Sequence, residues 1–173
     1  MSVARKPERS GTRGCAHLVE IEAPIARVWR ALTDPALIRL WSGGTAEIDA
    51  RKGGRYRLSA RGTGAREAHI DVFDANRRLR LIYMSGPDMP HINSAIVDAF
   101  LLDVRKGTTT TSLRLLGSGI PEAKSWDQAY MRLRIGWEGY LARIKLVLEN
   151  PPRPKKEQEK AKPVDPPLPG LDY

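Results

Sequence analysis

The longest regular pattern of apolar positions lies near the C-terminal end of the chain. Between residues 126 and 149, apolar side chains recur every three or four positions, and charged side chains occupy the opposite side. The apolar positions are Trp126, Tyr130, Leu133, Trp137, Leu141, Ile144 and Leu148. The charged positions are Asp127, Arg134, Glu138, Lys145 and Glu149. This spacing predicts one long amphipathic helix, whose aromatic-rich face must be buried against another layer of the fold.

Apolar positions in the centre of the chain instead alternate with a period of two. They predict six strands, at residues 46–49, 55–60, 67–73, 79–84, 95–104 and 109–116. Turn residues such as Gly53-Gly54 and Lys106-Gly107 separate these strands. No segment of helical period lies between them, so neighbouring strands are expected to pair antiparallel.

One further strand and two short helices are predicted before this region. Residues 15–21 alternate like a strand, and Pro24 suits the first turn of a helix. Pro35 ends that helix, because the residue before a proline avoids the helical conformation, and a second short helix follows. The predicted fold class is therefore α+β, with about seven antiparallel strands, two short helices after the first strand and one long C-terminal helix.

The two ends of the chain lack this periodicity. Residues 1–14 have no apolar pattern and are expected to form a disordered arm. Residues 150–173 hold seven of the thirteen prolines, interleaved with lysine and glutamate, so they bury too little apolar surface to offset the entropy of ordering. One domain is thus expected at residues 15–149.

Composition restricts the class of protein further. The chain has 173 residues, a formal net charge of +9 and a single cysteine, which excludes an internal disulfide and suits a reducing compartment. No apolar run approaches the ~18 residues of a membrane span, and no apolar segment follows the basic N-terminus as in a secretory signal. We therefore expect a soluble cytoplasmic protein.

Few residues are arranged as a catalytic or metal site requires. Cys15 and His17 share one side of a strand, but a structural zinc needs four ligands and no others lie nearby in the sequence. His69 and Asp71 alternate with apolar residues and are expected on the outer face of the sheet. We therefore predict no catalytic residue, no metal and no cofactor.

Four segments carry a resemblance to a known superfamily. They are IEAPIARVWRALTDPALIRLW at 21–41, KGGRY at 52–56, TSLRL at 111–115 and the helix at 136–149. In them the chain resembles the START-like, or SRPBCC, superfamily, and within it the subgroup related to the C-terminal domain of the Aha-type activator of the ninety-kilodalton heat-shock ATPase. The resemblance implies a helix-grip fold, in which a curved antiparallel sheet wraps around the C-terminal helix.

Two positions depart from the pattern of these relatives. Ala68 and Val72, ahead of Asp74, stand where the relatives often carry a glycine and an acidic residue. Leu116-Gly117 stands where their last strand often ends in a histidine. These differences imply an unusually apolar interior with no inward acid or histidine, which weighs against catalysis.

The implied fold leaves a space between sheet and helix that apolar side chains would line. The residues expected to bind a ligand there are Trp41, Tyr56, Leu58, Ile70, Val72, Leu81, Tyr83, Phe100, Leu102, Leu113, Trp126, Tyr130, Leu133 and Trp137. The same side chains would also serve as a solid core, and the sequence leaves both interpretations open.

Basic residues concentrate on one predicted hairpin. Arg51, Arg55 and Arg57 form either a solvated surface or a binding surface for an acidic protein partner. Nucleic acid is disfavoured, because Tyr56, the aromatic residue between Arg55 and Arg57, is expected on the opposite, buried face of the strand and so cannot stack on bases beside the arginines.

Three functions are compatible with these observations. The sequence favours non-enzymatic binding of a small apolar or amphipathic ligand between sheet and helix. The resemblance suggests as the alternative a co-chaperone-like protein that modulates a partner ATPase through its surface. A cyclase or hydratase is a third, since the same fold supports all three functions.

Overall fold

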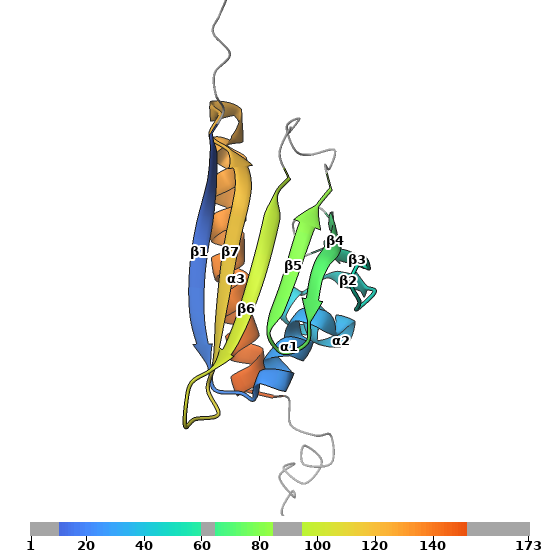
Figure 1. The fold of residues 1–173 in the computed structure, drawn as a ribbon, viewed down its shortest axis with the longest axis vertical. Helices are drawn as coiled ribbons and strands as arrows, with labels where there is room; N and C mark the ends of the chain where they lie inside the picture. Colours follow the sequence, from blue (N-terminus) through green and yellow to red (C-terminus); the bar gives the residue numbers. More distant parts are fainter. Residues whose placement is uncertain (1–10, 60–64, 85–94, 152–173) are drawn as a thin grey trace, which may run out of the picture.

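One antiparallel sheet of seven strands dominates the computed structural model, which describes residues 11–59, 65–84 and 95–151 (Figure 1). The strands are β1 (Thr12–Ile21), β2 (Thr45–Ile48), β3 (Arg55–Ser59), β4 (Ala65–Asp74), β5 (Arg78–Tyr83), β6 (Val97–Val104) and β7 (Thr111–Pro121). Their order across the sheet is β1-β7-β6-β5-β4-β3-β2, so the first strand pairs with the last. All neighbours are antiparallel, as the alternation predicted.

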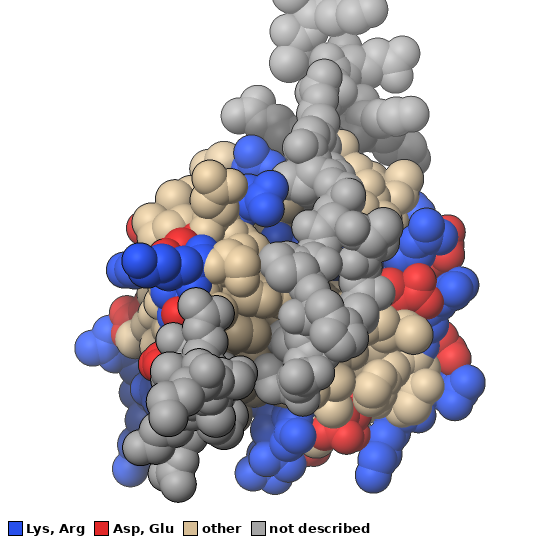
Figure 2. All heavy atoms as spheres, turned by 90° about the horizontal axis from the view of Figure 1, so that it is seen from above, with Lys and Arg blue, Asp and Glu red and all other residues tan. Residues whose placement is uncertain are grey.

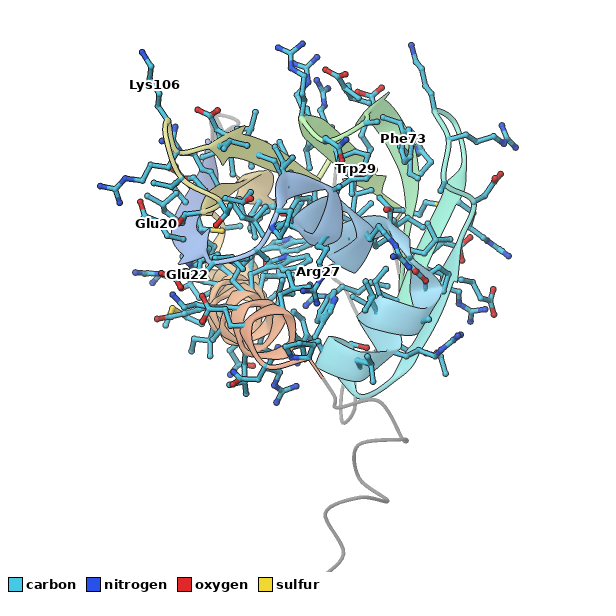
Figure 3. The ribbon with its side chains drawn as sticks, turned by 90° about the horizontal axis from the view of Figure 1, so that it is seen from below. Glu20, Glu22, Arg27, Trp29, Phe73 and Lys106 are labelled. Atoms are coloured by element: carbon cyan, nitrogen blue, oxygen red, sulfur yellow. The ribbon has the colours of Figure 1, made fainter. Side chains whose placement is uncertain are left out.

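Three α-helices and one short 3₁₀ turn complete the described part of the chain. They are α1 (Ile25–Thr33), α2 (Pro35–Ser42), the turn η1 (Lys124–Trp126) and α3 (Asp127–Glu149). The long helix α3 runs alongside β1, and α1 and α2 lie at one end of the sheet (Figure 1). Seen from that end, the sheet curves around α1 and α3 (Figure 3). This is the α+β helix-grip architecture that the resemblance implied.

The junction between α1 and α2 forms as the sequence predicted. Asp34 ends α1, and its carboxylate accepts a hydrogen bond of 2.9 Å from the backbone N–H of Ala36, which caps α2. Pro35 occupies the first position of α2, where a missing N–H costs nothing. Gly43 ends α2 in the left-handed conformation, with φ at 68°.

The sheet reaches further in both directions than the alternation indicated. β1 begins at Thr12 and pairs there with Pro121, so residues 12–14, which the sequence placed in the arm, belong to the sheet. Arg13 forms an ion pair of 2.7 Å with Asp127 and lies 4.4 Å from the ring centroid of Tyr130. The rest of the predicted arm and all but the start of the predicted tail fall outside the described residues.

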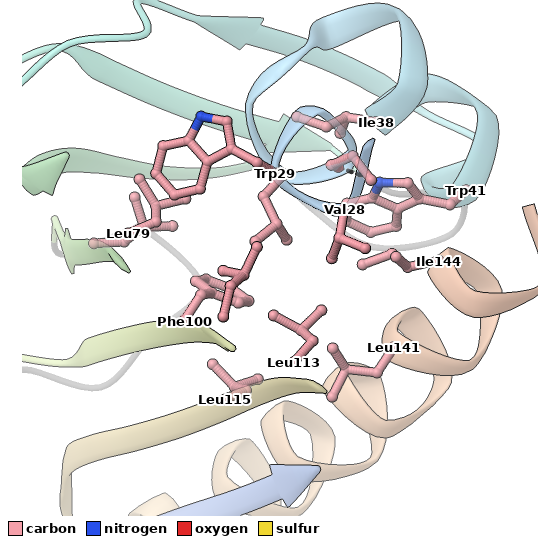
Figure 4. Close-up of a cluster of buried hydrophobic side chains, with 14 of the residues drawn as sticks. Val28, Trp29, Ile38, Trp41, Leu79, Phe100, Leu113, Leu115, Leu141 and Ile144 are labelled. Atoms are coloured by element: carbon pink, nitrogen blue, oxygen red, sulfur yellow. Dashed lines mark hydrogen bonds between the residues drawn. The ribbon is translucent and has the colours of Figure 1, made fainter. Parts of the chain in front are cut away.

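The core divides into a large and a small apolar cluster. The large cluster joins the inner face of the sheet to α1, α2 and the C-terminal half of α3 (Figure 4). Within it the indole N–H of Trp41 donates to the carbonyl of Ala31 at 2.8 Å. The small cluster lies at the opposite end and consists of Ile96, Ile120, Trp126, Ala129 and Leu133.

The predicted division of α3 into two faces is confirmed. Of the seven apolar positions predicted for this helix, Trp126 lies in η1 and is buried, five on α3 are buried, and Tyr130 is half-buried with its hydroxyl donating to the carbonyl of Gly14. Lys145 donates to the carbonyl of Glu20 at 2.8 Å. Side chains of α3 thus reach backbone carbonyls of β1, which ties the helix to that edge of the sheet.

A β-bulge in β4 reverses the alternation that the sequence suggested. Ile70 pairs with Leu81, but the register then shifts, so that Val72 pairs with Arg80 and Phe73 pairs with Leu79. Partners across a ladder share a face, so Val72 faces outward with Arg80. Phe73 takes the inward position and packs edge-on against Trp29, at 5.1 Å between ring centroids (Figure 3).

Candidate functional site

A buried carboxylate lies on the inner face of the sheet, where the two apolar clusters meet. Asp98 on β6 is 5% exposed and alternates with two apolar residues, Ile96 of the small cluster and Phe100 of the large one. A charged side chain is seldom buried so fully unless other groups compensate for the lost water. Asp98 is therefore the first residue to consider as functional.

Asp98 is one of three residues that lie side by side across β6, β7 and β1. Asp98 pairs with Gly117 of β7, and Gly117 pairs with Cys15 of β1. A Cβ atom on Gly117 would lie 2.9 Å from Sγ of Cys15 and 3.2 Å from Oδ1 of Asp98. The absence of a side chain at this position thus makes room for the thiol and the carboxylate on the inner face.

Two aromatic side chains direct polar hydrogens at Asp98. The hydroxyl of Tyr83, on β5, faces the carboxylate and stabilises its charged form. The indole N–H of Trp137, on α3, also faces the carboxylate, but within the described part of the chain it has no hydrogen bond of good geometry. Trp137 is 2% exposed, so its indole N–H is also shielded from water.

Burial sets the acidity of this group. Loss of water raises the pKa of Asp98 from 3.8 to about 6, and the Tyr83 hydroxyl, the Arg66 guanidinium and the Trp137 N–H oppose that rise. Burial, followed by the neighbouring charge of Asp98, also raises the pKa of Tyr83 well above its usual 10.0. At neutral pH the site therefore holds a carboxylate beside a neutral phenol.

Two further polar side chains occupy the inner face of β1. Burial, and then the charge of Asp98, raise the pKa of the Cys15 thiol, while the Gly117 backbone and Arg134 act in the opposite direction. The thiol is therefore protonated at neutral pH and is a poor nucleophile. His17 pairs with the buried Leu115, and its Nε2 atom is buried without a hydrogen-bond partner in the segments that the structure describes.

The structure divides the predicted ligand-binding residues among three places. Those in the large cluster are Trp41, Tyr56, Leu58, Ile70, Leu81, Phe100, Leu102, Leu113 and Trp137. Trp126 and Leu133 belong to the small cluster with Tyr130 packed against them, and Tyr83 contacts both clusters. Val72 lies on the outer face, so its predicted place in the interior is wrong.

Sequence reasoning missed the polar residues of the interior. It expected no inward acid or histidine, yet Asp98 and His17 both lie on the inner face. The signal was present, because Asp98 alternates with Ile96 and Phe100 and so shares their side of the strand. That particular argument against catalysis is therefore removed.

The basic hairpin is less basic than its sequence suggests. Arg55 forms ion pairs with Glu67 at 2.8 Å and with Glu47 at 3.9 Å, and Arg57 approaches Glu47 at 4.0 Å. Arg51 pairs with Asp49 at 2.7 Å. In the view from above, Lys and Arg side chains alternate with Asp and Glu along the side where β2 and β3 lie (Figure 2). This surface carries mixed charge.

Neither a metal centre nor a membrane helix is found in the part of the chain that was described. No group of three or more His, Cys, Asp or Glu side chains is placed to hold a metal ion among residues 11–59, 65–84 and 95–151. Over the same residues, no helix is long and apolar enough to span a membrane.

Comparisons with known proteins agree with the fold. The chain is similar to protein MLL2253 from Mesorhizobium loti, with 23% identity and a TM-score of 0.69 over 82% of this chain and 100% of that one. It is also similar to PFC0360w, an HSP90 activator from Plasmodium falciparum, with 20% identity and a TM-score of 0.66 over 80% and 97% of the two chains. The chain is also similar to the Aha1 dimer from Colwellia psychrerythraea, with 19% identity and a TM-score of 0.63 over 79% of this chain and 96% of that one.

These identities establish a shared fold and nothing finer. No curated protein matches the sequence. A model of the family described as "Activator of Hsp90 ATPase homolog 1-like protein" matches residues 22–149, which include all the helices and strands of the described residues except β1. Because that match spans most of the chain, the protein belongs to the family of Activator of Hsp90 ATPase homolog 1-like proteins.

Proposed function

We propose that this protein binds a small apolar or amphipathic molecule between the inner face of the sheet and α3, without catalysing a reaction on it. One observation carries the proposal. The buried indole N–H of Trp137 lacks a hydrogen-bond partner of good geometry in the described residues, and it faces a buried carboxylate. A buried donor without an acceptor costs about 1–3 kcal/mol, and a bound molecule that supplies the acceptor would remove that cost.

The surroundings of this polar pair support the same function. Ligand sites are mostly apolar and contain a few converging polar groups that fix the orientation of the ligand. Asp98, Tyr83 and Trp137 converge here from β6, β5 and α3, between the two apolar clusters. The inward-facing members of the predicted set of ligand-binding residues would form the apolar wall.

A substitution at Gly117 tests the proposal. Gly117→Ala would place a methyl group 2.9 Å from Sγ of Cys15 and 3.2 Å from Oδ1 of Asp98, so the thiol must move and the carboxylate must give slightly, which alters the proposed site. Titration with a dye that fluoresces in apolar surroundings should show one saturable site in the wild-type protein. The substitution should weaken that binding at least severalfold.

Two variants serve as controls. Gly136→Ala on α3 places its methyl group where no atom lies within 4 Å, and Val72→Phe enlarges a side chain on the outer face. Both should bind the dye as the wild-type protein does. Absence of saturable binding to the wild-type protein, or equal weakening in all three variants, would show the proposal to be wrong.

Family membership favours a second candidate function, in which the protein stimulates a partner ATPase of the heat-shock class. One similar structure is described as an HSP90 activator. The ion pairs of Arg55 and Arg57 with acidic neighbours weaken the hairpin as a docking surface, yet reversing both charges still tests it. Partner ATPase activity that falls on this reversal, and stays unchanged in Gly117→Ala, would favour the second candidate.

A further inference from the structure

The hydrogen-bonding capacity of the Asp98 site is incompletely used. A carboxylate has two oxygens and accepts up to about four hydrogen bonds. The Tyr83 hydroxyl faces one of these positions, and the Trp137 N–H faces the group without a hydrogen bond of good geometry in the described residues. The site therefore offers a bound molecule one free donor, the Trp137 N–H, and at least one free acceptor position on Asp98.

Few ligand groups can accept a hydrogen bond from Trp137 and donate one to Asp98 at the same time. A hydroxyl oxygen accepts one hydrogen bond and donates another, so it can bridge Trp137 and Asp98. An ether or a ketone accepts from Trp137 but gives nothing to Asp98. A carboxylate brings a second negative charge beside the first, in surroundings where that repulsion is weakly screened.

Other charged and titratable groups approach Asp98 from each neighbouring element. Arg66 approaches from β4 and Cys15 from β1, and Tyr83 and Tyr56 face the carboxylate from β5 and β3. On α3, Arg134 is exposed and acts on Cys15. His17 lies two positions along β1 from Cys15 and on the same face.

These neighbours leave Asp98 as the dominant buried charge. Arg66 is half-buried and the Asp98 pKa is nevertheless raised, so the arginine compensates for burial only in part. Burial raises the pKa of Tyr56 and of Tyr83, and both phenols are neutral at physiological pH. An anionic ligand head at this point would therefore meet net repulsion.

We infer that the ligand is an uncharged alcohol or phenol, whose hydroxyl accepts from Trp137 Nε1–H and donates to the Asp98 carboxylate while its apolar body contacts the two clusters. This inference rests on the proposed function and specifies the chemistry of the same site. Tyr83, which contacts both clusters, would position the carboxylate through its hydroxyl.

Three probes of nearly equal size separate the possibilities: octylphenol, its methyl ether and octylbenzoate. Displacement of the apolar dye from the intact protein at about pH 7.5 gives the affinity of each. Octylphenol should bind about tenfold or more tightly than the methyl ether, the ratio that a hydrogen bond to a charged group supports. Octylbenzoate should bind more weakly than both.

Substitutions then assign the difference to Asp98. Asp98→Leu should bring octylphenol and its methyl ether to similar affinities. Asp98→Asn, which keeps the shape and an acceptor oxygen, should reduce the discrimination against octylbenzoate. Below about pH 6, protonation of Asp98 in the wild-type protein should weaken octylphenol binding, because a carboxylic acid is the poorer acceptor.

The outcomes distinguish this inference from the proposal beneath it. Octylbenzoate that equals or exceeds octylphenol on the wild-type protein, or a methyl ether that equals octylphenol, would overturn the hydroxyl inference and leave small-molecule binding intact. Failure of all three probes and of the dye to bind would refute both. If Asp98→Leu does not fold, the Asp98→Asn variant and the pH series still decide the matter.

Discussion

Removing the charge of Asp98 should change how stability depends on pH. The pKa of this carboxyl rises from 3.8 to about 6 on folding, so between these values the folded chain holds a proton that the unfolded chain has released. Stability that is present below pH 3.8 is therefore lost as the pH rises towards about 6. At about 1.36 kcal/mol per pKa unit, the loss is roughly 3 kcal/mol at neutral pH.

The Asp98→Asn variant isolates this effect, because it keeps the size of the side chain and one acceptor oxygen. Any constant cost of the amide cancels when one variant is compared with wild type at two pH values. The stability of the variant relative to wild type should therefore rise by roughly 2–3 kcal/mol between about pH 4 and about pH 7.5. Urea unfolding followed by circular dichroism at each pH measures the difference.

Asp103→Asn is the matched control, since Asp103 lies on the same strand and is exposed. Its stability difference should stay nearly flat over the same pH range. If the Asp98 variant is also flat, or if both variants show the same slope, then Asp98 does not carry a raised pKa and its description as a buried charge is wrong.

Three further substitutions test the packing of the fold by urea unfolding. Trp137→Ala should cost about 3–5 kcal/mol, against about 0.5 or less for Glu138→Ala on the wet face, and equal midpoints would refute the assigned faces of α3. Gly136→Ala should stabilise by about 0.5–1 kcal/mol, since nothing obstructs the added methyl group, and a loss of stability would contradict that geometry. Thr111→Val should cost about 1–3 kcal/mol, because it removes a buried hydrogen bond of 2.7 Å to the Ala23 carbonyl, and a neutral effect would show that the carbonyl finds another donor.

The elements that the sequence predicted best are those whose burial pattern is purely local. The helix α3 needs only a repeat of three to four residues, and most strands need only alternation, so their existence and buried faces followed from the chain itself. The predicted strand ended at residue 116, whereas β7 continues to Pro121 through Gly117 and Gly119, which have no side chain to continue the alternation. In the structure, a Cβ atom on Gly119 would collide with the backbone of Ala95, so this glycine permits a close approach between strands.

Features that depend on distant parts of the chain could not be predicted. The bulge after Ile70 exists because β4 and β5 pair in a shifted register, and neither strand alone contains that information. The consequence for Val72 is complete reversal, from the inner to the outer face. The environment of Asp98 likewise requires Tyr83, Gly117 and Trp137 to meet from three other elements.

The position of Asp98 links the stability of the fold to its proposed use. Its buried charge costs roughly 3 kcal/mol at neutral pH, and an apolar residue of similar size at this place in β6 would avoid that cost. The structure adds an indole N–H without a hydrogen-bond partner of good geometry in the described residues, and a glycine against which the Cys15 thiol and the Asp98 carboxylate pack. Each of these features lowers the stability of the apolar core. Together they leave a donor and an acceptor facing each other in an apolar interior, which is what the recognition of one polar group on an otherwise apolar molecule requires.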